Sequence, residues 1–388
     1  MADKLYYLDS HLFEFPAQIL DCIPRRDGTF DVILDRTAFF PEGGGQRADE
    51  GTIGGITVLH VSEKDGEIMH RCAAPLETGN RVECRIDRET RLRRMQDHSG
   101  EHVVSGLVHS LFGYENVGFH MSDGFMTVDF SGELREEEIE RLETEANRIV
   151  RANVPVTAYF PSPEELQKLD YRSKLDLTEN VRLVRIEGCD LCACCAPHVS
   201  RTGEIGIIRI LDHTRHRGGT RITLTCGMDA LDDYRRRQKN TVRISNALSA
   251  KQENIADAVD RMLEHTEAQK QRIAELSMAN VEYRTAGQEK VDGNICIVDR
   301  LLDEIALREL VNRMAEKCSG IAAVLFPAGE GQWRYIIGSR NTDLRKNAAL
   351  INRGISGKGG GSSTMIQGSC SGDAEQIRQF LTEIQLEN

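Results

Sequence analysis

Hydrophobic and polar residues alternate along the first part of the chain, as they do in half-buried β-strands. Two such alternating runs lie at 29–34 and 56–61. The turn signals that divide the runs are Asp27-Gly28, Asp65-Gly66 and Gly79-Asn80. A glycine-rich loop at 40–46 interrupts the pattern. We therefore predict a small barrel or sandwich of strands over residues 1–87.

The periodicity changes after residue 88. Apolar residues then recur at helical spacing, and Gly113 follows as a stop signal. A second helix is predicted over 134–152. Strand-like runs complete the segment, at 181–186, 205–211 and 220–226. This mixture predicts an α+β core over residues 88–229.

Residues 230–286 are polar, charged and free of proline and glycine. Their apolar positions form a heptad-like stripe that consists of Ile255, Val259, Met262, Ile273 and Leu276. We predict a helical hairpin or coiled-coil linker here, which serves as a spacer or as the contact of a homodimer. The C-terminal domain is the alternative contact for a homodimer.

Strand-like and helical runs alternate again over residues 287–388, which is the pattern of a small α/β domain. A second glycine-rich segment, at 357–363, is predicted to be a loop. Together the patterns predict an α+β protein. Its parts are an N-terminal small β-barrel, an α+β core, a long helical linker and a small α/β C-terminal domain.

Composition narrows the class of protein. The 388-residue chain carries 11 cysteines and a formal net charge of -12 at pH 7. No apolar run approaches membrane-spanning length and no secretory signal begins the chain, so we expect a cytoplasmic protein without a membrane partner. Clustered cysteines in that reducing compartment indicate metal or redox chemistry. The acidity argues weakly against a nucleic-acid partner, although arginine-rich clusters at 91–94, 215–221 and 235–239 could form local basic faces.

The sharpest local signal is a histidine pair on the first predicted helix. His98 and His102 are four residues apart, so both imidazoles lie on one face of the helix. A second pair, Cys194 and His198, is also four apart and lies in a loop that contains Pro197. The four side chains form a Cys/His3 set typical of zinc. We predict that they bind one Zn²⁺ per chain.

Three motifs, in this order, resemble the editing domain of alanyl-tRNA synthetase and its free-standing relatives, the AlaX proteins. They are Thr-Ala-Phe-Phe-Pro-Glu-Gly-Gly-Gly-Gln at 37–46 with Asp49 and Gly51, then His98-x-x-x-His102, then Cys194-x-x-x-His198 continuing to Gly206. A further stretch, Gly357 to Gly361 with Met365, Gln367 and Gly368, resembles the DHH-associated domain that ends the synthetase. The chain departs from the family at 194–198, where CGGTH is usual. It also departs at Glu101, where threonine is common.

The resemblance implies a cytoplasmic hydrolase of the large AlaX type that acts in trans. Its partner would be tRNA(Ala) mischarged with serine or glycine. It implies that 88–229 is a zinc-binding editing core and that 287–388 is a DHH-associated domain, in which Lys358 is a candidate contact for the tRNA backbone. It assigns no role to Cys189, Cys192 or Cys195, and Cys195 could compete with Cys194 for the metal.

The catalytic candidates lie in the first motif. The loop offers the backbone N–H groups of Gly44 and Gly45, and the side-chain amide of Gln46, to a developing oxyanion. Thr37 is the candidate discriminator, because a hydroxyl built to bind the serine hydroxyl rejects alanine. Asp97 and Glu101 neighbour the metal ligands, and at least one of them is expected to be only a helix-surface charge.

Two other functions stay open at this point. The run from His98 to His102 also matches the H-x-x-E-H pattern of zinc peptidases, with Glu101 as general base and a downstream carboxylate as third ligand. The other alternative is a non-enzymatic tRNA-binding protein with a structural zinc, because four protein ligands usually make a closed site.

Overall fold

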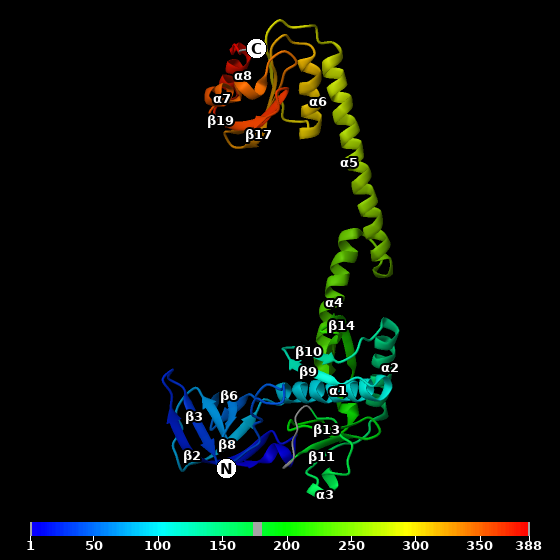
Figure 1. The fold of residues 1–388 in the computed structure, drawn as a ribbon. Coiled ribbons are helices and arrows are strands. Elements are labelled where there is room, and N and C mark those ends of the chain that lie inside the picture. Colours follow the sequence, from blue (N-terminus) through cyan, green and yellow to red (C-terminus); the bar gives the residue numbers. More distant parts are fainter. Residues whose placement is uncertain (1, 174–180, 387–388) are drawn as a thin grey trace. The chain divides into compact units, whose positions relative to one another are not determined.

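A computed structural model of the chain describes residues 2–173 and 181–386. The chain divides into two units, Met1–Arg243 and Ile244–Asn388. Both contain helices and strands (Figure 1), so the predicted α+β class is confirmed. Within the described ranges, no helix combines the length and the apolar character that a membrane span requires.

Six antiparallel strands near the start of unit 1 pair in a closed ring, in the order β2-β3-β7-β6-β5-β8. Their bounds are β2 Glu14–Pro24, β3 Phe30–Leu34, β5 Gly51–Ile53, β6 Ile56–Lys64, β7 Glu67–Cys72 and β8 Arg81–Ile86. Side chains alternate between the two faces: Phe15, Ala17 and Ile19 of β2 are buried and the residues between them are exposed. A short parallel pair, β1 (Asp3–Lys4) and β4 (Arg36–Thr37), precedes the glycine-rich loop.

Helix α1 (Arg88–Phe112) follows the barrel (Figure 1). It carries the two predicted histidine ligands, His98 and His102. Asp87 caps its first turn by accepting a hydrogen bond from the Thr90 backbone N–H. Gly113 ends it in the left-handed conformation, as the stop signal predicts. Every residue from Asp97 to Val108 is buried, so the two predicted metal ligands lie on an enclosed part of the helix.

Two sheets and a helix enclose α1. The sheets have the orders β14-β15-β10-β9 and β11-β12-β13. Their elements, with the helices of this region, are β9 Asn116–Met121, β10 Met126–Phe130, α2 Glu136–Ala152, β11 Val156–Tyr159, α3 Pro163–Leu166, β12 Leu183–Ile186, β13 Asp190–Ala193, η2 Thr202–Ile205, β14 Ile208–His216 and β15 Gly219–Cys226. Two glycines of α1 let the neighbouring segments approach the helix closely. A Cβ at Gly100 would lie 2.3 Å from Cys226 Sγ, and one at Gly106 would lie 2.6 Å from the Cys189 carbonyl oxygen.

Helix α4 (Gly227–Leu248) contains the boundary between the units, and α5 (Ile255–Ala286) follows a single turn, η3 (Gln252–Asn254). This agrees with the helical segment predicted for 230–286. The rest of unit 2 is a five-stranded sheet, in the order β16-β17-β18-β20-β19. Its elements are β16 Ile295–Val298, α6 Glu304–Ala315, β17 Ala322–Gly329, β18 Gln332–Gly338, α7 Leu344–Gly354, β19 Gly357–Gly361, β20 Met365–Ser371 and α8 Ala374–Glu383.

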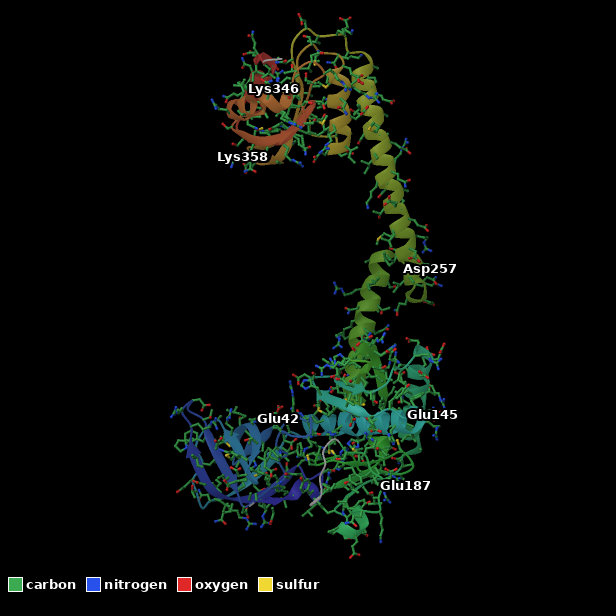
Figure 2. The ribbon with its side chains drawn as sticks, viewed as in Figure 1. Glu42, Glu145, Glu187, Asp257, Lys346 and Lys358 are labelled. Carbon is green, nitrogen blue, oxygen red and sulfur yellow. The ribbon has the colours of Figure 1, made fainter. Side chains whose placement is uncertain are left out.

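The sheet of unit 2 has a core on each face. Ala322 and Val324 of β17 pack in the core that contains α6, whereas Ala323 and Leu325 pack in the core that contains α7 and α8. This is the alternation expected of a strand buried on both sides. Lys346 on α7 and Lys358 on β19 are exposed side chains of this unit (Figure 2).

The loop predicted at 357–363 is wrong over most of its length, because residues 357–361 form strand β19. The glycines are needed for contact rather than for a turn. A Cβ at Gly359 would lie 2.3 Å from the Tyr335 hydroxyl and 2.3 Å from the Gln367 carbonyl oxygen. Glycine therefore lets β19 lie close to β20 and to the side chain of Tyr335 on β18.

Candidate functional site

The four predicted metal ligands lie together. His98 and His102 come from α1, and Cys194 and His198 come from the segment that follows β13. Their ligand atoms all lie within 4.8 Å of one another. The three histidines are buried, so these polar rings are removed from water and depend on the partners that surround them.

The spacing of these atoms fits a tetrahedral metal ion. Cys194 Sγ lies 3.6 Å from His98 Nε2 and 3.3 Å from His198 Nε2. A tetrahedral zinc ion, with Zn–N bonds of about 2.0–2.1 Å and a Zn–S bond of about 2.3 Å, separates sulfur from nitrogen by roughly 3.5 Å. One thiolate with three imidazoles is also a softer donor set than magnesium or calcium takes. The residues therefore form a site that can hold a metal ion.

Each ligand histidine is also held at its other ring nitrogen. The pairs are His98 Nδ1 with Gln46 Oε1 (2.8 Å), His102 Nδ1 with Asp190 Oδ2 (2.9 Å) and His198 Nδ1 with Ser99 Oγ (3.0 Å). Amide and carboxylate oxygens only accept hydrogen bonds, so Nδ1 donates in the first two pairs. This leaves the Nε2 lone pair of His98 and of His102 directed at the cluster.

Asp190 is fixed in turn by Arg172, which donates from Nε and Nη2 to the two carboxylate oxygens at 2.7 and 2.8 Å. Burial on its own raises the pKa of Asp190, but the hydrogen bonds from His102 and Arg172 outweigh it and lower the pKa to about 2. Asp190 is therefore an ionised acceptor that orients His102. The sequence analysis missed it, because it lies 88 residues from its partner and belongs to no local pattern.

Cys194 supplies the thiol of the cluster. Burial raises its pKa, but the electrostatic interactions and hydrogen bonds with the three histidines outweigh burial and hold the pKa well below its ordinary value. Cys195 is not among the clustered ligand atoms of the described residues. It lies instead beside the glycine-rich loop, where a Cβ on Gly44 would be 3.4 Å from its Sγ.

The glycine-rich loop reaches the same place from the barrel. Gly43 and Gln46 close it through two backbone hydrogen bonds of 3.1 and 3.0 Å. Gly44 and Gly45, between them, have positive φ values of 60° and 83°. A Cβ on Gly45 would lie 2.4 Å from the Phe119 ring, so only glycine fits.

Gln46 connects this loop to the cluster. Its side chain is only 1% exposed, and its Oε1 accepts the hydrogen bond from His98. Its Nε2 has no hydrogen-bond partner among the described residues. Buried amide donors are nearly always satisfied, so this nitrogen is placed to meet an acceptor that a ligand or water brings.

A cavity of about 460 Å³ opens beside the cluster. Its wall includes His98, His102, Cys194, Gly44 and Gly45. A serine or glycine residue fills a small part of such a volume, which lies in the range of sites for larger ligands.

Aromatic and cationic side chains form another part of the wall. Tyr7 and Phe160 meet edge to face, with ring centroids 5.7 Å apart. Arg182 lies over the Tyr7 ring at 5.0 Å. Phe160 is 53% exposed, so a large apolar ring faces solvent at the cavity.

Thr37 lies apart from this cavity. It is fully buried, and its hydroxyl lies 2.8 Å from His70 Nε2 and accepts from the Phe39 backbone N–H. Because His70 Nδ1 donates to the Val32 carbonyl oxygen, Nε2 is the acceptor and the Thr37 hydroxyl donates to it. Thr37 is not part of the cavity wall.

The expectation that Asp97 or Glu101 is a helix-surface charge is wrong. Both are buried, with 3% and 4% exposure. Asp97 accepts a hydrogen bond of 2.9 Å from the Cys226 backbone N–H, whereas Glu101 lines the cavity. The enclosed part of α1 therefore buries charged residues alongside apolar ones such as Val103 and Val104.

Comparison with known proteins gives two domain families. Residues 181–244 match the family described as "Threonyl and Alanyl tRNA synthetase second additional domain". Residues 18–90 match the family described as "tRNA synthetases class II (A)".

Relatives cover most of the chain. Alanyl-tRNA editing protein AlaX-L of Pyrococcus horikoshii is 28% identical over 97% of this chain and 96% of that protein. Alanine–tRNA ligase of Halobacterium salinarum is 31% identical over 87% of this chain, which is 38% of the ligase. Alanyl-tRNA editing protein Aarsd1 of Danio rerio is 34% identical over 52% of this chain and 53% of that protein. The chain thus matches one editing protein over nearly its whole length and the ligase over a part of it.

Proposed function

Because the chain belongs to the AlaX family of alanyl-tRNA editing proteins, we propose that it is an aminoacyl-tRNA hydrolase that acts in trans on mischarged tRNA(Ala). Its proposed substrates are Ser-tRNA(Ala) and Gly-tRNA(Ala). The observation that carries the proposal is the joint position of the Cys/His3 cluster and the glycine-rich loop on the wall of one cavity. The reaction is hydrolysis of the ester between the amino acid and the terminal ribose.

We propose that His98, His102, Cys194 and His198 hold one Zn²⁺ per chain. When bound, zinc supplies positive charge and Lewis acidity to the cavity wall. The ligands themselves tie α1 to the segment after β13, so metal binding also fixes the shape of that wall.

Gln46 is the proposed donor to the oxyanion of the ester. Its amide oxygen is already occupied by His98, which fixes the orientation of the amide group and leaves Nε2 for a new acceptor. A preoriented donor of this kind stabilises charge that develops in the transition state. The backbone N–H groups of Gly44 and Gly45, on the cavity wall, are the proposed companions of this donor.

The terminal nucleoside of the tRNA is proposed to occupy the rest of the cavity. The faces of Tyr7 and Phe160 suit a planar base, and Arg182 adds positive charge beside them. Stacking on aromatic and arginine side chains is how proteins hold unpaired bases of single-stranded RNA ends.

Thr37 remains the proposed discriminator between serine and alanine, but we now propose that it acts indirectly and does not bind the serine hydroxyl. Its single proton is engaged with His70, and the residue does not line the cavity. We propose that Thr37 acts by holding the backbone at Phe39, five to seven residues before Gly44, Gly45 and Gln46, rather than by touching the substrate.

The zinc-peptidase alternative is less well supported. It needs a carboxylate as third ligand beside His98 and His102. In the described part of the chain, the group of ligand atoms that contains both histidines is completed by Cys194 and His198 and holds no carboxylate.

The proposal is tested by measuring deacylation of Ser-tRNA(Ala), Gly-tRNA(Ala) and correct Ala-tRNA(Ala), with bound zinc assayed in the same preparation. We expect fast release of serine or glycine, slow release of alanine and about one zinc per chain. Cys194→Ser should lose both zinc and activity, whereas Cys195→Ser, one residue away, should keep both. Bound zinc without deacylation of any of the three would overturn the enzymatic proposal and favour a tRNA-binding protein.

We also propose that α5 supports a homodimer. Three residues of the predicted apolar stripe, Met262, Ile273 and Leu276, are exposed along this helix, and so is Leu263, which is not one of the stripe positions. Light scattering on the purified protein tests this: a monomer mass at micromolar concentration would contradict it.

A further inference from the structure

Arg91 and Asp49 form an ion pair in the interior of unit 1. Arg91 lies on α1 and Asp49 follows the glycine-rich loop, and the side chain of each is 0% exposed. Arg91 therefore cannot belong to the basic face that the arginine cluster at 91–94 suggested. A buried ion pair is costly to desolvate, and apolar side chains of similar volume often stabilise a fold equally well. The pair therefore indicates a need for accurate geometry rather than for stability.

The guanidinium of Arg91 holds three segments of the chain together. Its Nε donates to the two carboxylate oxygens of Asp49 at 2.8 and 2.9 Å, and Nη2 donates to the same carboxylate. Nη2 also donates to the Ala38 carbonyl oxygen at 2.5 Å, and Nη1 donates to the Ser10 carbonyl oxygen at 3.0 Å. The guanidinium is planar and its donors are fixed, so α1, the segment at Ser10 and the segment 38–49 share one arrangement.

The connection through Asp49 leads to the glycine-rich loop. Asp49 accepts a hydrogen bond of 2.6 Å from the Phe40 backbone N–H, and its own N–H donates to the Phe40 carbonyl oxygen at 3.0 Å. These bonds close the base of the segment that carries Gln46. The hydrogen bond of 2.8 Å between Gln46 and His98 joins the same loop to α1 a second time. Arg91 therefore holds the base of the loop against the helix whose His98 meets the other end.

The other connections lead to the metal cluster. Arg91 lies seven residues before His98 on α1, which is about two helical turns, so the two residues lie on the same side of one rigid element. Ser10 accepts from Arg91 and in turn donates from its hydroxyl to the His198 carbonyl oxygen at 2.7 Å. Arg91 is thus bound to the base of the glycine-rich loop and, through Ser10, to the backbone of a predicted metal ligand.

The proposed reaction needs these segments to be placed accurately. The proposed oxyanion donor, Gln46, belongs to the loop, whereas the predicted metal ligands belong to α1 and to the segment after β13. The carbonyl group of the ester must meet both at once, and a misplacement of about 1 Å can lower a rate about 100-fold. We propose that Arg91, through Asp49, is a positioning residue that sets the glycine-rich loop against the metal ligands. This inference rests on the proposed editing function.

Replacement of a positioning residue should lower kcat and leave KM in place. The proposed contacts of the terminal base, Phe160 and Arg182, belong to other segments of the chain. Arg91→Lys keeps a positive charge beside Asp49, but an ammonium group lacks the planar fork that reaches three acceptors at once. We expect Arg91→Lys to bind zinc as the wild type does, to keep its KM for Ser-tRNA(Ala) and to lose about 10- to 100-fold in kcat. Steady-state deacylation and zinc content measure these effects.

A second variant separates positioning from stability. Arg91→Met combined with Asp49→Leu replaces the ion pair by apolar side chains, so neither partner is left as an unpaired buried charge. We expect the folded double variant, checked by circular dichroism, to keep its zinc and to show the same low kcat as Arg91→Lys. Arg284→Lys is the matched control, because Arg284 donates to the buried Asp299 in unit 2, at 2.5 Å. Its kcat should equal that of the wild type.

Wild-type kcat in Arg91→Lys, or a loss that lies in KM alone, would overturn the proposal. Wild-type kcat in the folded double variant would also overturn it, and Arg91→Lys decides alone if the double variant does not fold. If the wild type cleaves no aminoacyl-tRNA, the editing function fails, and hydrogen–deuterium exchange then judges the positioning role by itself. Backbone amides of 40–49 should exchange faster in Arg91→Lys than in the wild type, whereas those of unit 2 should not change. Equal exchange of 40–49 in both proteins would show that Arg91 does not hold the loop.

Discussion

The chemistry at the residue scale depends on side chains that serve two partners at once. Gln46 is the clearest case, because one end of its amide holds His98 and the other end meets no partner in the described part of the chain. The two ends can be separated by substitution. The carboxylate of Gln46→Glu keeps an acceptor for His98 Nδ1 but removes the donor.

We therefore predict that Gln46→Glu keeps its zinc and loses about 100- to 1,000-fold in kcat, the usual loss for one oxyanion donor. Gln46→Ala should also weaken zinc binding, by about 10- to 100-fold, because His98 loses its acceptor. Zinc titration and single-turnover deacylation measure the two effects. Full activity in Gln46→Glu would show that the amide nitrogen does not serve the reaction.

Thr37 gives the second prediction at this scale. Thr37→Val removes the donor to His70 and the acceptor for the Phe39 N–H, which should cost about 1–3 kcal/mol of stability. It should also narrow the ratio of Ser-tRNA(Ala) to Ala-tRNA(Ala) deacylation rates. Thr37→Ser keeps the hydroxyl and is the control. An unchanged ratio in a destabilised Thr37→Val protein would restrict this residue to a structural role.

The sequence predicted which four side chains cluster, but not the residues that hold these side chains and the neighbouring Glu101 in place. His98 and His102 share a helical spacing that any reader of the sequence can find. Asp190 and Asn116 could not be found in this way, because the contacts with His102 and Glu101 cross 88 and 15 residues and follow no local period. Such partners appear only when sheets and helix have been packed together.

At the scale of elements, α1 works because two glycines let the sheets lie against it. Gly100→Ala should gain up to about 1 kcal/mol of helix propensity. The new methyl group would meet Cys226 Sγ at 2.3 Å, and overpacking of this kind costs about 1–3 kcal/mol. We predict a net loss of stability.

The same change should be tolerated when the sulfur is absent. In a Cys226→Ala background, Gly100→Ala should cost less than in the wild type, and chemical denaturation of the four proteins measures this coupling. Additive effects of the two substitutions would contradict the assigned contact. The sequence could not predict the contact between Gly100 and Cys226, because a glycine within a helical pattern does not indicate which residue packs against it.

The aromatic wall of the cavity gives the next prediction. If Phe160 stacks on the terminal base, Phe160→Ala should raise KM for Ser-tRNA(Ala) by roughly 5- to 150-fold, from about 1–3 kcal/mol of stacking per base. Phe160→Tyr should restore binding. Phe125→Ala is a suitable control, because Phe125 is also exposed but does not line the cavity. A tRNA that lacks its terminal adenosine should bind Phe160→Ala and the wild type equally.

Element types were predictable where the periodicity was long, as for the helices within 230–286. They were not predictable for Gly357–Gly361, which forms a strand although glycine disfavours strands. Its register is fixed by close contact with Tyr335 and with β20. Tertiary contact there outweighs the local preference.

At the scale of the whole molecule, the chain consists of two units with separate cores, Met1–Arg243 and Ile244–Asn388. The boundary between the units falls within α4, where the amino-acid composition does not change. The pattern of hydrophobic and polar residues therefore could not predict this boundary. The His98, His102, Cys194 and His198 cluster belongs to the first unit. The single tryptophan of the chain, Trp333, belongs to the second unit, on β18.

Because of this division, the effect of the metal on the stability of unit 1 can be measured separately from the stability of unit 2. Anything that binds the native state alone stabilises the unit that binds it, by about 2.7 kcal/mol when its free concentration is 100 times its dissociation constant. Chelation of zinc should therefore lower the unfolding temperature of unit 1. Unit 2 has no zinc ligand from the cluster, so its transition should stay in place.

Tryptophan fluorescence reports on Trp333 and hence on unit 2, whereas circular dichroism reports on both units. We predict that a chelator shifts one circular-dichroism transition downwards, leaves the fluorescence transition unchanged, and that added zinc reverses the shift. Cys194→Ser should reproduce the chelated state without a chelator. If the fluorescence transition shifts together with the circular-dichroism transition, the two units unfold as one cooperative body. Zinc then stabilises unit 2, which contains the tRNA-binding candidate Lys358, as well as unit 1.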